Sequence, residues 1–218
     1  MKERKGAGER RRVLVTAGPT REYVDPVRFL TNESSGRMGF AIAAAAAEAG
    51  HAVTLVAGPV HLATPPGVER IDVESARQML AAVRGAFERA DALFMAAAVA
   101  DWRPRRRRRG KWRKEVEGGA TASLELVRNP DILATVARKK GRRLVVGFAL
   151  ETGDGLARAR DKLVRKNADY VVLNGPSALN AARTDVTILD ERGEVRRLSK
   201  KSKDAVARVL VGLIDRER

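Results

Sequence analysis

Hydrophobic positions in this chain form short continuous runs, separated by longer segments with helical periodicity. Two such runs, at residues 12–18 and 51–58, flank an alanine-rich stretch that ends at Gly50. Alanine is the best helix former, so strand, helix and strand at this spacing predict a βαβ unit with parallel strands. Further strands are expected at residues 68–73 and 91–101, and the second of these is central because it is apolar throughout.

The same alternation continues after a long interruption at residues 102–121, which are basic and have no clear period, and which we predict to be a loop. Strands are expected at 123–127, 143–150 and 169–174, and a hairpin at 186–199. Helices are expected at 75–90, 129–141 and 154–168, and a last one from Ser202. Ser75 and Asn129 are the expected N-caps, with Pro130 in the first helical position.

This order predicts an α/β fold: a Rossmann-like open, mostly parallel sheet with helices on both faces, a long loop and a C-terminal antiparallel hairpin. We expect a basic tail at residues 1–11 and a single α/β domain at residues 12–218, with the loop at residues 102–121 inside it.

Composition narrows the class of protein. With 218 residues, 44% of them hydrophobic, the chain can bury a sizeable core. It has no cysteine, so disulfides and thiolate metal sites are excluded, which fits a reducing cytosol. We find no signal peptide, and no run reaches the roughly 18 apolar residues that a membrane span needs, so we expect a cytoplasmic protein.

The formal net charge of +16 suggests nucleic acid, but the location of the charge weakens that interpretation. Residues 1–12 hold six basic and two acidic groups, and residues 103–114 hold nine basic groups and no acidic one, so the rest of the chain is nearly neutral. The run from Arg105 to Arg109 is most simply a solvated loop. Few aromatic side chains accompany it to stack on bases.

Small and polar residues gather where the predicted strands end, at 16–20, 96–101, 147–152 and 173–177. Ligands of open α/β sheets bind at this edge, although strand ends also carry turn residues for structural reasons alone. The polar string before the alanine-rich helix, with Ser34, Gly36 and Gly39, suits a phosphate at the helix N-terminus. No G-x-G-x-x-G fingerprint follows the first strand, which disfavours a nicotinamide or flavin cofactor.

Lys162 and Lys166 lie four residues apart on one face of a predicted helix, where like charges repel. Two interpretations stay open: an exposed basic face, which is the default, and a pair directed at a polyphosphate that removes the repulsion. His51 and His61 lack a spacing typical of metal ligands and receive no role.

Six segments together resemble the phosphopantothenoylcysteine synthetase family. They are VLVTAGPTREYVDPVRFLTNESSGRMGFAIA, VTLVAGPV, AAAVADWRP, LELVRNPDILA, VVGFALET and KLVRKNADYVVLN, and the resemblance covers almost the whole chain from Arg12 onward. It implies a ligase of coenzyme A biosynthesis. CTP, rather than ATP, would convert the carboxylate of 4′-phosphopantothenate to an acyl-cytidylate, and the amine of L-cysteine would then displace the nucleotide.

The resemblance also implies partners. Mg²⁺ would accompany the triphosphate, although we can name no protein ligand for it. The enzyme would be a homodimer, either free-standing or cut from a fusion, with a flavin-dependent decarboxylase as its fused or separate companion.

Residue roles follow from the same resemblance. Asn32 would hold the substrate carboxylate and the acyl intermediate, Arg28 would anchor the pantothenate side, and Ala97 and Ala98 would leave room beside the reacting groups. Nucleotide contacts are implied for Gly18, Ser34, Gly36, Gly39, Met95, Ala96, Ala97, Asp101, Lys111, Asn129, Pro130, Asp131, Ile132, Phe148, Lys162, Lys166 and Asn174.

The loop at residues 102–121 resembles the family's strap, an arm that reaches over the active site of a dimer. Its functional lysine aligns with Lys111, and Lys114 is the alternative register. The five arginines before Lys111 and the segment at residues 174–185 depart from the family pattern. Two other functions therefore stay open: nucleic-acid binding through the arginine-rich segments, and an inactive homologue that only binds nucleotide.

Overall fold

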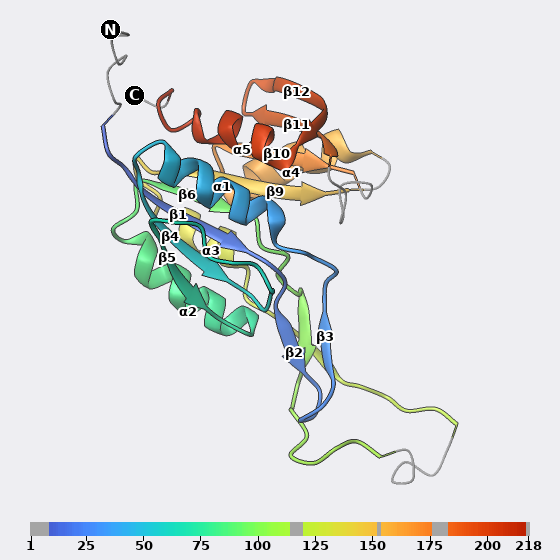
Figure 1. Cartoon of the computed structure of the whole chain (residues 1–218). Helices are drawn as coiled ribbons and strands as arrows, with labels where there is room; N and C mark the ends of the chain where they lie inside the picture. The colour runs from blue at the N-terminus through green and yellow to red at the C-terminus, as the bar shows by residue number, and fades with distance from the viewer. Residues whose placement is uncertain (1–8, 114–119, 152–153, 176–182, 217–218) are drawn as a thin grey trace, which may run out of the picture.

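A computed structural model of the chain describes residues 9–113, 120–151, 154–175 and 183–216. Eight strands form one sheet in the order β12-β11-β10-β9-β6-β1-β4-β5 (Figure 1). Six are parallel: β1 (Arg12–Ala17), β4 (Ala52–Ala57), β5 (Val68–Asp72), β6 (Ala92–Met95), β9 (Leu144–Leu150) and β10 (Tyr170–Asn174). At one edge β11 (Arg183–Asp190) and β12 (Gly193–Ser202) add the predicted antiparallel hairpin.

The chain winds in two directions from the middle of this sheet. From β1 it proceeds to β4 and β5 on one side, and from β6 it proceeds to β9 and β10 on the other. The strand order therefore reverses between β1 and β6, which makes a doubly wound sheet with a topological switch point. This arrangement confirms the predicted fold class.

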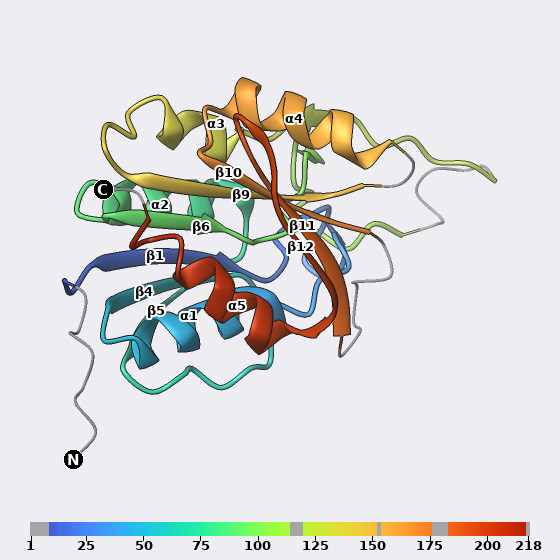
Figure 2. The same cartoon turned by 90° about the horizontal axis from the view of Figure 1, so that it is seen from above.

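Helices cover both faces of the sheet, as Figure 2 shows. On one face lie α1 (Arg37–Glu48) and α5 (Lys203–Val211), and on the other lie α2 (Ala76–Phe87), α3 (Ile132–Ala137) and α4 (Gly155–Lys166). Both faces of β1 carry apolar side chains, because Val13 and Val15 face the first layer while Leu14 faces the second. Ser75 and Ser202 cap α2 and α5, as predicted for Ser75.

The predicted start of α3 is wrong. The helix begins at Ile132, and its N-cap is Asp131, whose side chain accepts a hydrogen bond from the N–H of Ala134 at 2.9 Å. Asn129 is engaged elsewhere, because its side-chain amide donates to the carbonyl of Ala100 at 2.8 Å. Pro130 consequently precedes the helix rather than opening it.

The predicted strand at residues 91–101 is also too long, since β6 ends at Met95. Beyond that point the backbone bends toward the loop after β1. The N–H of Ala97 donates to the hydroxyl of Thr16 at 3.1 Å, and the N–H of Ala98 donates to the carbonyl of Gly18 at 2.9 Å. The apolar residues after Met95 therefore form a loop at the end of the sheet.

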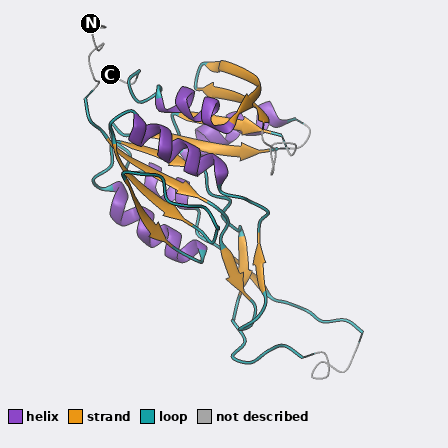
Figure 3. Ribbon diagram, in the orientation of Figure 1, coloured by secondary structure: helices purple, strands orange, loops and turns teal. Residues whose placement is uncertain are grey.

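Two short antiparallel pairs extend beyond the sheet (Figure 3). Strand β2 (Arg21–Tyr23) pairs with β3 (Phe29–Thr31), and β7 (Trp102–Pro104) pairs with β8 (Leu126–Arg128). The first pair was not predicted. The second corrects two expectations, because residues 102–104 of the predicted loop form a strand and the strand expected at 123–127 begins only at Leu126. We keep the name strap for residues 102–121. Residues 114–119, and with them Lys114, lie outside the described residues.

Candidate functional site

A pocket of about 510 Å³ opens at the carboxyl ends of β6 and β9, next to the switch point. That volume is within the range of about 300–1,000 Å³ that small-molecule sites occupy. It is lined by Met95, Ala97, Val99, Ala100, Asp101, Trp102, Arg128, Asn129, Pro130, Asp131, Ile132, Leu133, Phe148, Lys162, Arg165 and Lys166. The structure thus brings together most of the residues for which nucleotide contacts were implied.

Lys162 and Lys166 both line this pocket, so the interpretation as an exposed basic face is wrong. The ammonium group of Lys162 donates to the carbonyl of Phe148 at 2.5 Å. Burial lowers the pKa of Lys162, while the nearby carboxylates of Glu151 and Asp101 oppose that shift. A half-buried cation in a pocket is stabilised when an anion binds beside it.

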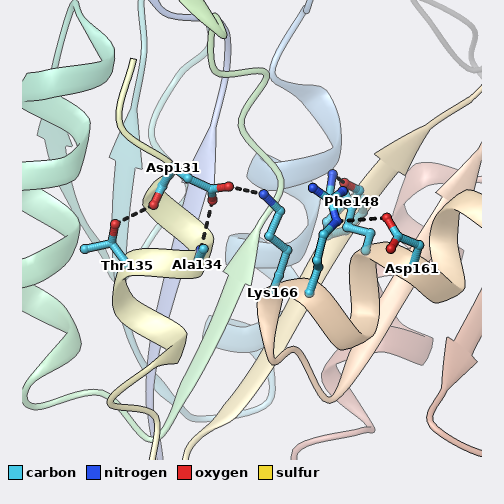
Figure 4. A network of polar contacts seen from close by, with 8 residues as sticks. Asp131, Ala134, Thr135, Phe148, Asp161 and Lys166 are labelled. Carbon is cyan, nitrogen blue, oxygen red and sulfur yellow. Dashed lines mark hydrogen bonds and ion pairs between the residues drawn. The ribbon is translucent and has the colours of Figure 1, made fainter. Parts of the chain in front are cut away.

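Lys166 is held by Asp131 across the gap between α3 and α4, and Figure 4 shows the two side chains pointing toward one another. One oxygen of Asp131 caps α3 and the other pairs with the Lys166 ammonium group. The Asp131 carboxylate therefore stabilises the start of α3, which lines the pocket, and also holds Lys166 in position.

The start of α1 lies against the loop that follows β1. Gly18 and Gly36 have φ values of 77° and 75°, a left-handed conformation that glycine adopts without strain. A Cβ added at Gly36 would lie 3.4 Å from the Cα of Gly18, so the two backbones touch. Helix α1 has no side-chain N-cap, although the hydroxyl of Ser34 accepts from the N–H of Gly36 at 3.4 Å. Backbone N–H groups of the first turn thus remain available to a ligand.

Asn32 connects this helix start to the pocket. Its side-chain amide donates to the carbonyls of Ala98 at 3.3 Å and Val99 at 3.1 Å. Thr16 and Thr20, which bound the predicted strand end at 16–20 but received no role of their own, are fully buried and hold the same loop from the other side, since the Thr20 hydroxyl accepts from the N–H of Ala100 at 3.0 Å. For Thr16 the available signal was a polar residue inside an apolar run.

Several predicted residues lie away from the pocket in this chain. Arg28 is bonded to the carboxylate of Asp25 and the carbonyl of Trp112, and Lys111 is exposed in the strap. Ala96 and Gly39 do not line the pocket, and Gly39 is buried against Ala17 of β1. Asn174 ends β10 with its Oδ1 atom buried and unpartnered among the described residues.

The pocket also includes residues to which no individual role was assigned: Val99 and Ala100, which lie in the predicted strand end at 96–101, and Trp102, Arg128, Leu133 and Arg165. Trp102 and Arg128 come from the unpredicted pair β7–β8, and the Arg128 guanidinium lies 5.4 Å from the centre of the Trp102 ring. Both lie inside the segments AAAVADWRP and LELVRNPDILA, so their place in those motifs was the available signal.

Within the part of the chain that the structure describes, no group of three or more histidine, cysteine or acidic residues could hold a metal ion. Mg²⁺ is commonly bound by substrate phosphates and one or two carboxylates rather than by a protein cage. Asp101, which lines the pocket, is a carboxylate of the right kind.

In the described ranges, no helix combines the length and apolar character needed to cross a membrane.

The doubly wound sheet with a pocket at its switch point places the chain in the class of Rossmann-like α/β proteins. The family model described as "DNA/pantothenate metabolism flavoprotein C-terminal domain" matches residues 8–217. The chain therefore belongs to this family.

Individual relatives agree with that assignment. The coenzyme A biosynthesis bifunctional protein CoaBC of Vibrio cholerae is 47% identical over 209 residues, which are 94% of this chain and 52% of that protein. The Escherichia coli protein of the same name is 49% identical over 166 residues, 76% of this chain and 41% of that protein. A crystal structure of the C-terminal domain of CoaBC has a TM-score of 0.81 at 41% identity, with 94% of each chain covered. The chain spans about half the length of the curated relatives it matches.

Proposed function

We propose that this chain is a phosphopantothenate–cysteine ligase that uses CTP. The observation that carries the proposal is the switch-point pocket, where Lys162 and Lys166 face the loop that Asn32 holds. Asn32, which is bonded to the pocket residue Val99, links this cationic wall to the start of α1, which has no side-chain cap. A triphosphate suits such a surface, because cations and free backbone N–H groups both favour anions.

In the first step a carboxylate oxygen of 4′-phosphopantothenate attacks the α-phosphorus of CTP and pyrophosphate leaves. Lys162 and Lys166 hold phosphate oxygens and stabilise their charge. The side-chain amide of Asn32 orients the carboxylate, and the short side chains of Ala97 and Ala98 leave room for it. Mg²⁺, when bound with the triphosphate, supplies further charge neutralisation, with Asp101 as the carboxylate that could contribute.

In the second step the amine of L-cysteine attacks the acyl carbon of the acyl-cytidylate and CMP leaves. The nucleotide remains against Phe148 and the segment Asn129 to Ile132 until this step is complete. Asn174 does not line this pocket, so its contact with the nucleotide rests on the family resemblance, and its buried Oδ1 atom is the acceptor it would offer. Much of the catalysis is therefore positioning.

Arg28 and Lys111 support a homodimer as part of the proposal. Neither lines the pocket of its own chain, and both belong to the extension formed by β2, β3 and the strap (Figure 1). We infer that this extension serves the pocket of a second copy, so that Arg28 and Lys111 act in trans. A flavin-dependent decarboxylase, fused or separate, would convert the product onward.

The test is release of pyrophosphate by the purified chain with CTP, Mg²⁺, 4′-phosphopantothenate and L-cysteine. Release that requires 4′-phosphopantothenate, and that falls strongly when ATP replaces CTP, supports the proposal. Binding of CTP without pyrophosphate release identifies an inactive homologue. Tight binding of a DNA or RNA oligonucleotide that falls steeply with salt and survives Lys162→Met identifies a nucleic-acid-binding protein instead.

A further inference from the structure

Asp25 lies in the turn between β2 and β3, with its side chain fully buried. Its Oδ1 atom accepts the backbone N–H groups of Val27 at 2.7 Å and Arg28 at 2.8 Å. An aspartate before proline commonly forms such a turn, because its carboxylate bonds to the backbone two and three residues later. This half of the carboxylate therefore serves the hairpin itself.

The other half reaches the strap. The Oδ2 atom of Asp25 accepts the backbone N–H of Trp112 at 3.0 Å and the guanidinium of Arg28 at 3.2 Å. The same guanidinium donates to the carbonyl of Trp112 at 2.6 Å. Asp25 and Arg28 thus bind both polar backbone groups of one residue, although that residue is 87 positions further along the chain from Asp25.

Neighbouring contacts also connect the strap to this hairpin, and the arginines that make them are exposed. The backbone N–H of Arg108 donates to the carbonyl of Val24 at 2.8 Å. The guanidinium groups of Arg107 and Arg108 lie 4.6 Å and 4.1 Å from the ring centres of Tyr23 and Trp112. Exposed cation–π contacts are worth only about 0.5–1 kcal/mol each. A buried carboxylate left without its donors is far more unfavourable, so the Asp25 contact dominates.

We propose that Asp25 is a positioning residue of the strap: it fixes the backbone of Trp112 on the hairpin and thereby sets the position of the adjacent Lys111. The effect on catalysis rests on the proposed function, because it acts through Lys111. The anchoring itself is independent of any activity. The pKa of Asp25 is lowered to about 2, chiefly by the Trp112 N–H, so the carboxylate is ionised at neutral pH.

Asp25→Asn separates the two halves of this contact. Its amide oxygen can still accept from Val27 and Arg28, whereas its NH₂ group would face the N–H of Trp112, so donor meets donor. Asp190→Asn is a matched control, because Asp190 Oδ1 accepts from the N–H groups of Arg192 at 2.8 Å and Gly193 at 3.1 Å in the other hairpin. That turn has the same form and lies in the β11–β12 hairpin, away from the strap.

The chain has two tryptophans, so in a Trp102→Phe background Trp112 is the only one. We expect Asp25→Asn to raise acrylamide quenching of Trp112 fluorescence at least about twofold, and Asp190→Asn to leave it unchanged. With both tryptophans present, Asp25→Asn should lower kcat for pyrophosphate release at least about tenfold and change KM for CTP less than about threefold, since neither Asp25 nor Trp112 lines the CTP pocket.

Unchanged quenching in Asp25→Asn would overturn the anchoring. A loss of kcat matched by Asp190→Asn, or explained by the unfolded fraction at the assay temperature, would overturn the positioning role. If the wild-type chain releases no pyrophosphate, the proposed function fails, and the quenching experiment still decides whether Asp25 anchors the strap.

Discussion

Replacing Gly39 by alanine should destabilise the protein, although alanine is the better helix former. Gly39 lies in the first turn of α1, where the helix crosses β1. An added Cβ would lie 2.5 Å from the Cβ of Ala17, 2.8 Å from the carbonyl oxygen of Thr16 and 3.0 Å from the Cα of Ala17. Two of these atoms belong to the backbone of a central strand, so α1 itself must move.

The magnitude follows from two opposing effects. Overpacking of a well-packed interior costs about 1–3 kcal/mol. The helix propensity of alanine returns at most about 1 kcal/mol, and less in a first turn. We therefore expect a net loss of about 1–2 kcal/mol in the free energy of unfolding. For a chain of this size that corresponds to a fall in Tm of about 2–8 °C.

Gly85 in α2 provides the matched control, because a Cβ added there meets nothing within 4 Å. Gly85→Ala should gain about 0.5–1 kcal/mol from helix propensity alone. Urea unfolding followed by circular dichroism measures both variants against wild type. If Gly39→Ala were as stable as wild type, or gained stability as Gly85→Ala does, then the close approach of α1 to β1 would be wrong.

Three further predictions concern the site and the hairpin. Lys162→Met should weaken CTP binding by about 10- to 100-fold in calorimetry, the usual effect of losing a charge-assisted hydrogen bond, without lowering Tm; an unchanged affinity would remove Lys162 from the site. Asn32→Asp should keep the fold but reduce kcat at least about 100-fold, because a carboxylate replaces the amide donor and faces the carbonyls of Ala98 and Val99; near-normal turnover would count against its assigned role. The lowered pKa of Asp25 implies stability that is complete above its ordinary value of 3.8 and lost as the pH falls through about 2. The stability difference between wild type and Asp25→Asn in urea unfolding should therefore shrink from pH 5 toward pH 2, and a constant difference would contradict the shift.

Much of the sheet and of the pocket was predictable, because the features that specify them are local or follow a general rule. Continuous apolar runs such as 12–17 identify strands that helices cover on both faces. Carboxyl ends of parallel strands meet at one edge, so Asp101 and Phe148 could be placed together without knowing any contact. The resemblance to a family then supplied Asn129 to Ile132, which no periodicity indicates.

The failures have equally physical causes. Asn129 and Asp131 are both good N-caps, and only the contact between Asn129 and Ala100 decides between them. Strands of three residues, such as β2 and β7, are too short for an alternating pattern to be recognised. Lys162 and Lys166 were ambiguous because a basic helical face can border either solvent or a polar pocket. The sequence does not show which residues lie opposite that face.

The strap shows where local reasoning ends. The turn half of Asp25 can be inferred from its position before Pro26, whereas its contact with Trp112 depends on folding. The same contact changes the interpretation of the arginine run. The arginines are exposed, but several of them contact named residues of the chain. Arg105 pairs with Glu125 at 2.8 Å, and Arg107 and Arg108 lie over the rings of Tyr23 and Trp112. Arginines that suggest nucleic-acid binding in the sequence therefore have partners within the chain. Those partners help to position the strap.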